Sequence, residues 1–164
     1  MVQLVRFRLD DGARAQLAAL RERVWVRGIA VPTGPPAVTV AAAVTVPAPA
    51  RAALAAELRL LVLPSLWLAT LGTVSGRDDE LVLAAVVDAE LLAVHAAVHD
   101  ALAGRVRGPV AAYLPGTWLP HCVLATHDPA VAFAQLHPVS QVRATPVAVE
   151  VHDADTGTTT PLTP

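Results

Sequence analysis

Apolar residues along the chain recur at two different spacings, and each spacing marks one kind of secondary structure. Residues 2–9, VQLVRFRL, have the β-branched content and partial alternation that are typical of a strand. After Asp10, which can cap a helix, Leu17 and Val24 recur at helical spacing, and polar residues such as Arg21 are expected to turn elsewhere. The chain therefore opens with a strand followed by an amphipathic helix.

Proline and glycine mark where the later elements begin and end. The Pro-rich loop 31–36 leads into a strand, and Pro47 and Pro49 open a second helix. The segment SGRDD contains turn residues and joins two apolar runs that should pair as an antiparallel hairpin. The same signals predict strands at 37–46, 65–74, 80–87, within 116–128 and at 142–151, and helices starting near 47, 89 and 128.

The resulting order, β-α-β-α-β-β-α-β-α-β, contains no linker long or polar enough to separate domains. It predicts one α+β domain over residues 1–164. The segments PPAVTV and LPHCVL each place a proline just before a strand, and this repetition indicates two similar lobes around a central cleft.

Composition narrows the class of protein. Hydrophobic residues make up 54% of the chain, but Ala and Val supply much of that share, so we expect a core of small side chains. The single Cys122 excludes an internal disulfide and fits a reducing cytosol. No run approaches a membrane span, so we expect a cytoplasmic protein without a membrane partner. We also expect a monomer. A net charge of −2 predicts no extended nucleic-acid surface.

Two short stretches carry the candidate chemistry. Residues 113–125, YLPGTWLPHCVLA, place His121 at the start of a strand, and residues 35–40, PPAVTV, form the matching stretch upstream. Here the sequence resembles the 2H phosphoesterase superfamily, the 2′-5′ RNA ligase-like proteins, whose signature is a pair of His-x-Thr/Ser-x motifs. Segments 66–88, 91–102 and 142–157 are similar to a bacterial branch of this group, so the resemblance covers nearly the whole chain.

The resemblance implies a bilobal α+β fold, with two antiparallel sheets flanking a cleft and helices on the outside. It also implies hydrolysis of a 2′,3′-cyclic phosphate or a 2′-5′ phosphodiester by two histidines. One imidazole removes a proton from the attacking water, the other protonates the leaving oxygen, and the motif hydroxyls hold the phosphoryl oxygens. A pKa near 6.5 suits histidine to both tasks.

Both motifs are degenerate in this chain. The first keeps Thr39 but has Ala37 at the histidine position, and the second keeps His121 but has Val123 at the hydroxyl position. Loss of a general acid or base typically slows a reaction by about 100- to 10,000-fold. A lost hydrogen bond to phosphate in a buried site costs about 1–3 kcal/mol more. We therefore expect hydrolysis of the superfamily's substrates to be very slow.

The candidate site residues each have a structural alternative. His121 is either the catalytic acid or base, or a core histidine satisfied by a backbone carbonyl. Thr39 and Thr45 have the same parity on their strand and are expected to bind one ligand. Ala41 and Ala43 between them either leave open volume for that ligand or pack against a tryptophan.

Three further residues near the second motif are candidate ligand contacts. Tyr113 and Trp118 can stack on a base or another flat ligand, or serve as bulky core anchors in a chain with few aromatic residues. His127 would face the cleft if the strand stays regular that far, whereas Asp128 and Pro129 indicate an earlier end.

No metal and no cofactor are expected. His95 and His99 are four residues apart on a helix, a spacing that can bind a metal, but the apolar residues between them favour packing. Cys122 should point away from His121 along the strand and has no activating neighbour, so we expect an inert thiol.

Three functions stay open at this point. The first is a divergent 2H phosphoesterase-like protein that binds a small ligand, a nucleotide or another phosphoester, around His121 and Thr39. The second is an enzyme with a more apolar cleft that uses His121 alone in a non-phosphoryl reaction, and the third is a non-catalytic binding or scaffold protein. A basic rim would favour the first function. The candidate rim residues are Arg6, Arg8, Arg105, Arg107 and Arg143.

Rebuilding both motifs tests the resemblance. The double variant Ala37→His with Val123→Thr should show cyclic phosphodiesterase activity with a pH optimum bounded by two histidine-like pKa values. Overpacking could cost about 1–3 kcal/mol, so the free energy of unfolding is measured alongside hydrolysis. A folded double variant that neither hydrolyses nor binds a cyclic nucleotide would show that the rest of the cleft has diverged too.

Overall fold

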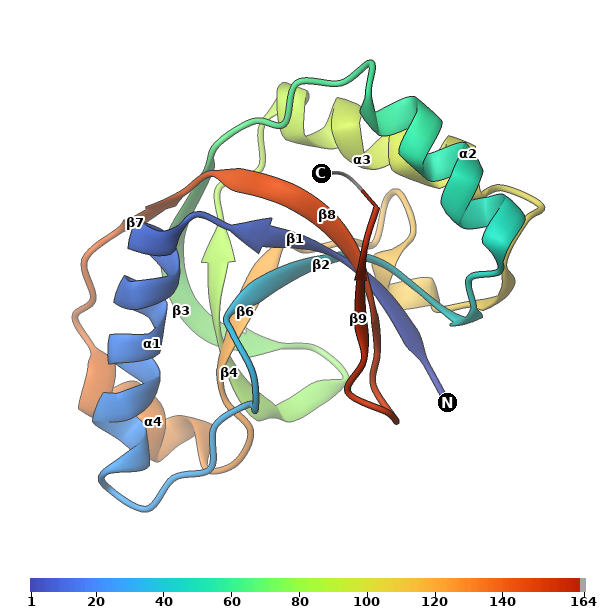
Figure 1. Ribbon diagram of the computed structural model, residues 1–164. Helices are drawn as coiled ribbons and strands as arrows, with labels where there is room; N and C mark the ends of the chain where they lie inside the picture. The colour runs from blue at the N-terminus through green and yellow to red at the C-terminus, as the bar shows by residue number, and fades with distance from the viewer. Residues whose placement is uncertain (163–164) are drawn as a thin grey trace.

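The computed structural model describes residues 1–162 and contains two antiparallel sheets (Figure 1). The first sheet has the strand order β5-β2-β1-β8-β9, and the second has the order β6-β4-β3-β7. The strands of the first sheet are β1 (Gln3–Leu9), β2 (Ala37–Thr45), β5 (Arg107–Pro109), β8 (Pro146–Asp153) and β9 (Thr159–Pro161). Those of the second are β3 (Leu66–Val74), β4 (Arg77–Ala85), β6 (His121–Ala125) and β7 (Val142–Ala144).

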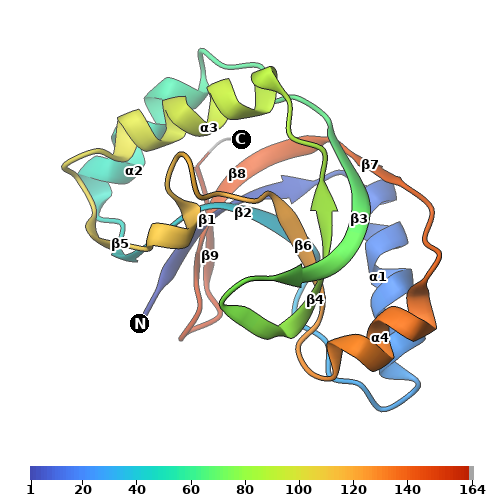
Figure 2. The same ribbon diagram turned by 180° about the vertical axis from the view of Figure 1, so that it is seen from behind.

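Two of the helices, α1 (Asp11–Trp25) and α3 (Ala89–Leu102), pack on the sheet opposite to the one whose strand precedes them. The others are α2 (Ala48–Leu58) and α4 (Pro129–Leu136), with a 3₁₀ turn, η1, at Ala111–Tyr113. Helix α1 follows a strand of the first sheet but packs with α4 on the second, whereas α3 follows a strand of the second sheet but packs with α2 and against β2 of the first. The two helix pairs lie on opposite sides of the molecule (Figures 1 and 2).

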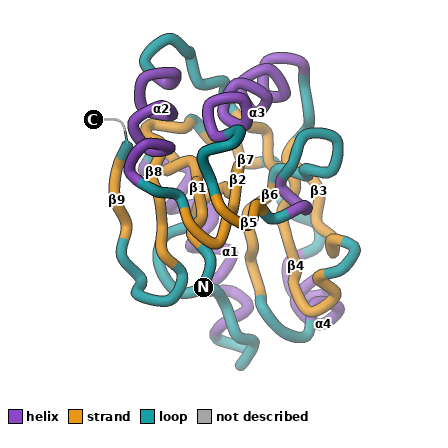
Figure 3. The backbone as a smooth tube through the Cα atoms, turned by 90° about the vertical axis from the view of Figure 1, so that its right-hand side faces the viewer, coloured by secondary structure: helices purple, strands orange, loops and turns teal. Residues whose placement is uncertain are grey.

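Figure 3 shows β8 and β9 of the first sheet on one side and β3 and β4 of the second on the other. The predicted α+β fold, with two antiparallel sheets and outer helices, is confirmed. The expected core of small side chains is only partly right: small residues from Ala41 to Ala43 are buried, but Phe7 and many leucines fill the largest volumes.

The predicted strand at 142–151 is two strands in two sheets. Thr145 separates β7, which pairs with β3, from β8, which pairs with β1. The side chain of Asp10 fixes this crossing, because its Oδ1 accepts the Thr145 N–H at 2.7 Å while its Oδ2 caps α1 through Ala13 N–H. The hydrogen bond from Thr145 is the main cause that lowers the pKa of Asp10.

The short strands β5 and β9 were not predicted. None of the helices in residues 1–162 combines the length and apolar character needed to cross a membrane.

Helix α3 buries a histidine in an aromatic contact. The His95 ring is 2% exposed, stacks on Trp118 with ring centroids 4.0 Å apart, and hydrogen-bonds the Tyr113 carbonyl through Nε2 at 2.8 Å. Burial, reinforced by nearby His99, lowers the pKa of His95 from 6.5 to about 4. The folded state therefore holds this ring neutral where the unfolded chain would protonate it.

This pKa difference should make the fold sensitive to acid. The contribution of His95 is fully present above pH 6.5, and it is lost as the pH falls towards 4, because the unfolded state binds the proton first. The loss amounts to roughly 3 kcal/mol for such a shift. Urea unfolding of wild type and His95→Gln between pH 7.5 and 4.5 measures it. The variant should be less stable at pH 7.5 but lose less on acidification, and equal pH slopes would contradict this account.

Candidate active-site cleft

Both degenerate motifs line one cleft between the two sheets. The cleft has a volume of about 490 Å³, and its walls include Ala37 and Thr39 from β2 and His121 and Val123 from β6. Strands β2 and β6 belong to different sheets and contact each other here. The first and third positions of each motif thus face a common space, as alternation along a strand allows.

His121 stands on the wall that the second sheet provides. Its Nδ1 lies 2.7 Å from the Leu119 carbonyl oxygen, which can only accept, so the neutral ring keeps its proton on Nδ1 and has a free lone pair on Nε2. Burial lowers the pKa of His121, and Arg77 lowers it further, against the Leu119 hydrogen bond and the charge of Glu80. A neutral imidazole with a free Nε2 can act as a general base.

Arg77, Glu80 and Tyr113 form a polar cluster on the same wall. Arg77 Nη2 donates to the Tyr113 hydroxyl, and its guanidinium carbon lies 5.1 Å from the centre of the tyrosine ring. Arg77 Nη1 lies 3.7 Å from Glu80 Oε2, an oxygen that is buried without a hydrogen bond among the described residues. The cluster presents an oriented guanidinium to the cleft, whereas Glu80 Oε2 is enclosed beside it.

Arg6 occupies the opposite wall, on the first sheet. It aligns with Thr39 of β2 and Glu150 of β8 in the ladders on either side of β1. Arg6 Nε donates to Glu150 Oε1 at 2.7 Å, and the two side chains are 13% and 8% exposed. Such a charged hydrogen bond fixes the guanidinium, so the cleft has one oriented arginine on each wall.

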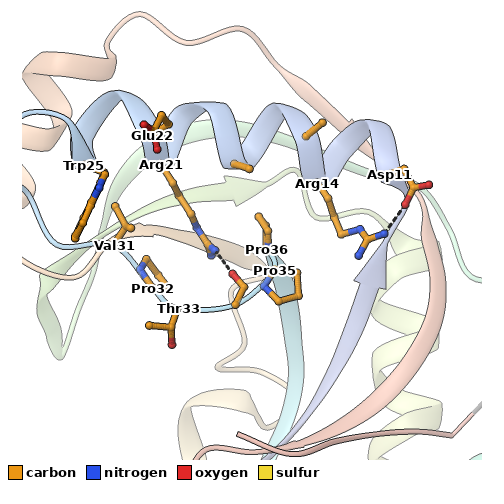
Figure 4. A pocket seen from close by; sticks show the side chains of 13 residues that line it. Asp11, Arg14, Arg21, Glu22, Trp25, Val31, Pro32, Thr33, Pro35 and Pro36 are labelled. Carbon is orange, nitrogen blue, oxygen red and sulfur yellow. Dashed lines mark hydrogen bonds and ion pairs between the residues drawn. The ribbon is translucent and has the colours of Figure 1, made fainter.

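Arg21 reaches the base of the cleft from α1. Its Nε and Nη2 donate to the Val123 carbonyl at 3.1 and 2.8 Å, and its Nη1 donates to the Gly34 carbonyl at 3.0 Å. Figure 4 shows the side chain crossing an outer groove of about 630 Å³ between α1 and the loop 31–36. One guanidinium therefore ties the loop that enters β2 to the second motif strand.

The expectation that Arg21 turns away from the core is wrong. Helical spacing places it on the face that also buries Leu17 and Val24, and its side chain is 8% exposed. The apolar stem can be buried there because the head finds backbone carbonyls. A hydrophobic pattern alone does not reveal such a partner.

Of the two threonines predicted to share a face, only Thr39 lines the cleft. The ladder between β1 and β2 shifts register between Val5, which pairs with Ala41, and Arg6, which pairs with Thr39. This bulge adds one residue to β2 and reverses the alternation beyond it. Thr45 therefore lies at the far end of β2, paired with Arg107, and outside the cleft.

The small residues of β2 open onto a different space. Ala41 and Ala43 line an apolar cavity of about 210 Å³ beside α3. The open volume that they were predicted to leave is thus present but separate from the cleft. His99 is the polar group of this cavity, and its Nε2 lies 3.0 Å from the Val40 carbonyl.

The three other candidates near the second motif lie in the cleft, in the core and on the exposed surface. Tyr113 lines the cleft. Trp118 does not, because it stacks on His95 and donates its indole N–H to the Thr39 carbonyl at 2.9 Å, so it anchors the core and positions the β2 backbone. His127 is exposed and outside the cleft, since β6 ends at Ala125 and the chain then turns.

The remaining reactive side chains take structural positions. Cys122 is buried, and burial raises the pKa of its thiol against the opposing charge of Arg21, which disfavours the thiolate. His95 and His99 each bond a backbone carbonyl. Residues 1–162 hold no group of three His, Cys, Asp or Glu side chains that could bind a metal ion.

Comparison with known proteins finds similarity in fold alone. No protein-family model matches the sequence, and no curated protein matches it. The structure of Kluyveromyces marxianus Usb1 matches at 12% identity and a TM-score of 0.49, over 98% of this chain and 97% of that chain. The structure of the same protein with uridine monophosphate matches at 13% identity and a TM-score of 0.44, over the same shares.

Sequence reasoning missed several residues of the cleft. They are Arg21, Arg77, Glu80, Thr126 and His152. Arg77 was assigned to the turn SGRDD, and Glu80 to the first position of the strand after it. In the structure β4 already begins at Arg77. The unusual charge at the start of an apolar strand was a usable signal for them. His152 gave no such signal.

The Arg21 contacts should be essential for stability. Arg21→Met leaves the Val123 and Gly34 carbonyls without their charged donors, and such hydrogen bonds are worth about 1.5–3 kcal/mol each. We expect the free energy of unfolding to fall by roughly 2–4 kcal/mol in urea titrations. Arg23→Met on the exposed side of the same helix is the matched control and should change it by about 0.5 kcal/mol or less. Equal stabilities of the two variants would refute the role given to Arg21.

Proposed function

We propose that the cleft binds the phosphate group of a small phosphoester, with a nucleotide as the favoured class, and that His121 supports slow proton transfer there. The observation that carries this proposal is the pair of oriented arginines, Arg6 and Arg77, on opposite walls. The chain as a whole has a net charge of −2, so this positive charge is local. Arginine is suited to phosphate because its planar fork donates two parallel hydrogen bonds.

The other lining residues fit the same ligand. Thr39 places a hydroxyl beside Arg6 and can donate to a phosphoryl oxygen. Leu4, Val31 and Pro32 supply an apolar part of the lining, where a base or another flat group can pack. Glu80 lines the cleft with a side chain that is 28% exposed, so its carboxylate can accept a hydrogen bond from a ribose hydroxyl. A nucleotide offers all three kinds of group.

The polar lining disfavours a non-phosphoryl enzyme with an apolar cleft. The lining includes three arginines, and only one carboxylate, Glu80, lies among the same residues. Arg6 and Arg77 are paired with the carboxylates of Glu150 and Glu80, and Arg21 has no carboxylate partner among residues 1–162. The site therefore keeps a positive charge that a negatively charged ligand offsets. A scaffold protein without a ligand would have no use for this arrangement, and binding measurements separate that alternative from the proposal.

Binding should depend on the arginines and on salt. Isothermal titration calorimetry with uridine monophosphate and with its 2′,3′-cyclic form should give saturable binding that weakens as ionic strength rises. Arg77→Met should weaken it about 10- to 100-fold, because a charged hydrogen bond is worth about 1.5–3 kcal/mol and each 1.4 kcal/mol is a factor of ten. Thr39→Val should weaken it about 3- to 10-fold, as expected for a neutral hydrogen bond.

The control is Arg59→Met, which removes an exposed arginine at the end of α2 and keeps the change in net charge the same. It should bind as wild type does. Absence of saturable binding by the folded wild type, or equal affinities of Arg77→Met and Arg59→Met, would overturn the proposed function.

A further inference from the structure

A second imidazole lies in the cleft, on the sheet opposite His121. His152 of β8 pairs with Leu4 of β1, and Leu4 pairs in turn with Ala42 of β2, so these three residues share one face of the first sheet. His152 and His121 line the same cleft. The sheet that carries Ala37, where an imidazole is missing, thus still supplies one from another strand.

One nitrogen of the His152 ring is held by β9. Nδ1 lies 2.9 Å from Thr159 Oγ1, in the register that pairs these two residues. A hydroxyl can donate to Nδ1 or accept from it, so Thr159 can hold the ring in its neutral and in its protonated state. Arg6 Nη2 lies 3.4 Å from the same hydroxyl oxygen and helps to fix it. No hydrogen bond to His152 Nε2 is present within residues 1–162, which leaves this atom for a ligand.

The two rings therefore have different supports. The Leu119 carbonyl beside His121 can only accept, which fixes Nε2 of the neutral ring as a proton acceptor. The Thr159 hydroxyl beside His152 serves either state of that ring, which suits a group that must carry a proton on Nε2 and then lose it.

We propose that His152 is the second proton-transfer group of the cleft and replaces the imidazole that is missing at position 37. This inference rests on the proposed function, because it needs a phosphoester bound between the two sheets. It assigns a catalytic role to a residue outside both motif positions.

For a 2′,3′-cyclic nucleotide the step is a hydrolysis. Nε2 of neutral His121 takes a proton from water as the water oxygen bonds to phosphorus. The bond between phosphorus and one ribose oxygen breaks, and that oxygen takes a proton from Nε2 of protonated His152. One water is consumed, a phosphomonoester forms, and the two rings regain their starting states by exchanging protons with solvent.

The charged groups around the two rings set the pH range of this step. They are Arg6, Glu150 and Asp153 around His152, and Arg77 and Glu80 around His121. Burial lowers the pKa of His152, and Arg6 lowers it further against the two carboxylates. Burial likewise lowers the pKa of His121. The bell-shaped profile of kcat/KM reports the free enzyme, so its maximum should lie on the acid side of pH 6.5.

The test is hydrolysis of uridine 2′,3′-cyclic monophosphate by full-length variants. His152→Gln and His121→Gln should each lower kcat/KM by about 100-fold or more, and each should remove one limb of the pH profile. The double variant should be only a few-fold slower than either single one, because the two groups act as a unit. His137→Gln removes an exposed imidazole at the end of α4, outside the cleft, and should match wild type.

Four measurements separate catalysis from structure. Uridine monophosphate should bind His152→Gln within a few-fold of wild type, and the thermal unfolding curve should show a folded protein. Added imidazole should restore part of the rate to His152→Gly. Thr159→Val, which keeps the ring but removes its support, should lower kcat more than it changes KM.

Each failure has a distinct meaning. A His152→Gln variant with the wild-type rate and both limbs of the profile overturns the role of His152 and leaves the proposed function standing. A wild-type protein that binds the nucleotides but does not hydrolyse the cyclic one overturns the role of His152 and the proton transfer by His121, and leaves phosphate binding in the cleft standing. Absence of nucleotide binding by wild type overturns both.

Discussion

The cleft depends on a buried cation that joins the two lobes through backbone carbonyls. Arg21 donates to Val123 on one motif strand and to Gly34 in the loop that enters the other. No carboxylate forms an ion pair with it among residues 1–162, and burial lowers its pKa, as desolvation of a cation must. Burying a charge this way is expensive unless its donors are satisfied, so the two carbonyls have to stay where the guanidinium needs them. The spacing of the motif strands follows from that requirement.

The same constraint explains how the lobes interlock. Helix α1 leaves the first sheet at Asp10, packs on the second, and carries Arg21 to the junction. Asp10 also holds Thr145, where the chain crosses back from β7 in the second sheet to β8 in the first. Two polar side chains on or beside one helix thus fix both crossings between the sheets, and the apolar core fills the space that they define.

The chemistry of the cleft differs from its sequence motifs because sheets bring distant strands together. A motif describes neighbours along one strand, and in this chain each motif has lost one polar side chain at Ala37 or Val123. The ladders beside β2 add Arg6 from β1, and β8 adds His152 on the same sheet. The charged and proton-transfer groups of the cleft are therefore spread over the four strands β1, β4, β6 and β8 and over helix α1, and two short motifs describe only part of them.

Local signals in the sequence were enough for most elements and for the positions of the motifs. Periodicity, the cap at Asp10 and the prolines before helices determine structure through contacts within a few residues. The α+β order and the placement of Ala37 and His121 on strands could therefore be predicted. The bulge that turns Thr45 away, the inward turn of Arg21, the split at Thr145 and the arrival of His152 could not. Each of these depends on a hydrogen-bond partner far away in the chain, and only the tertiary structure decides which partner that is.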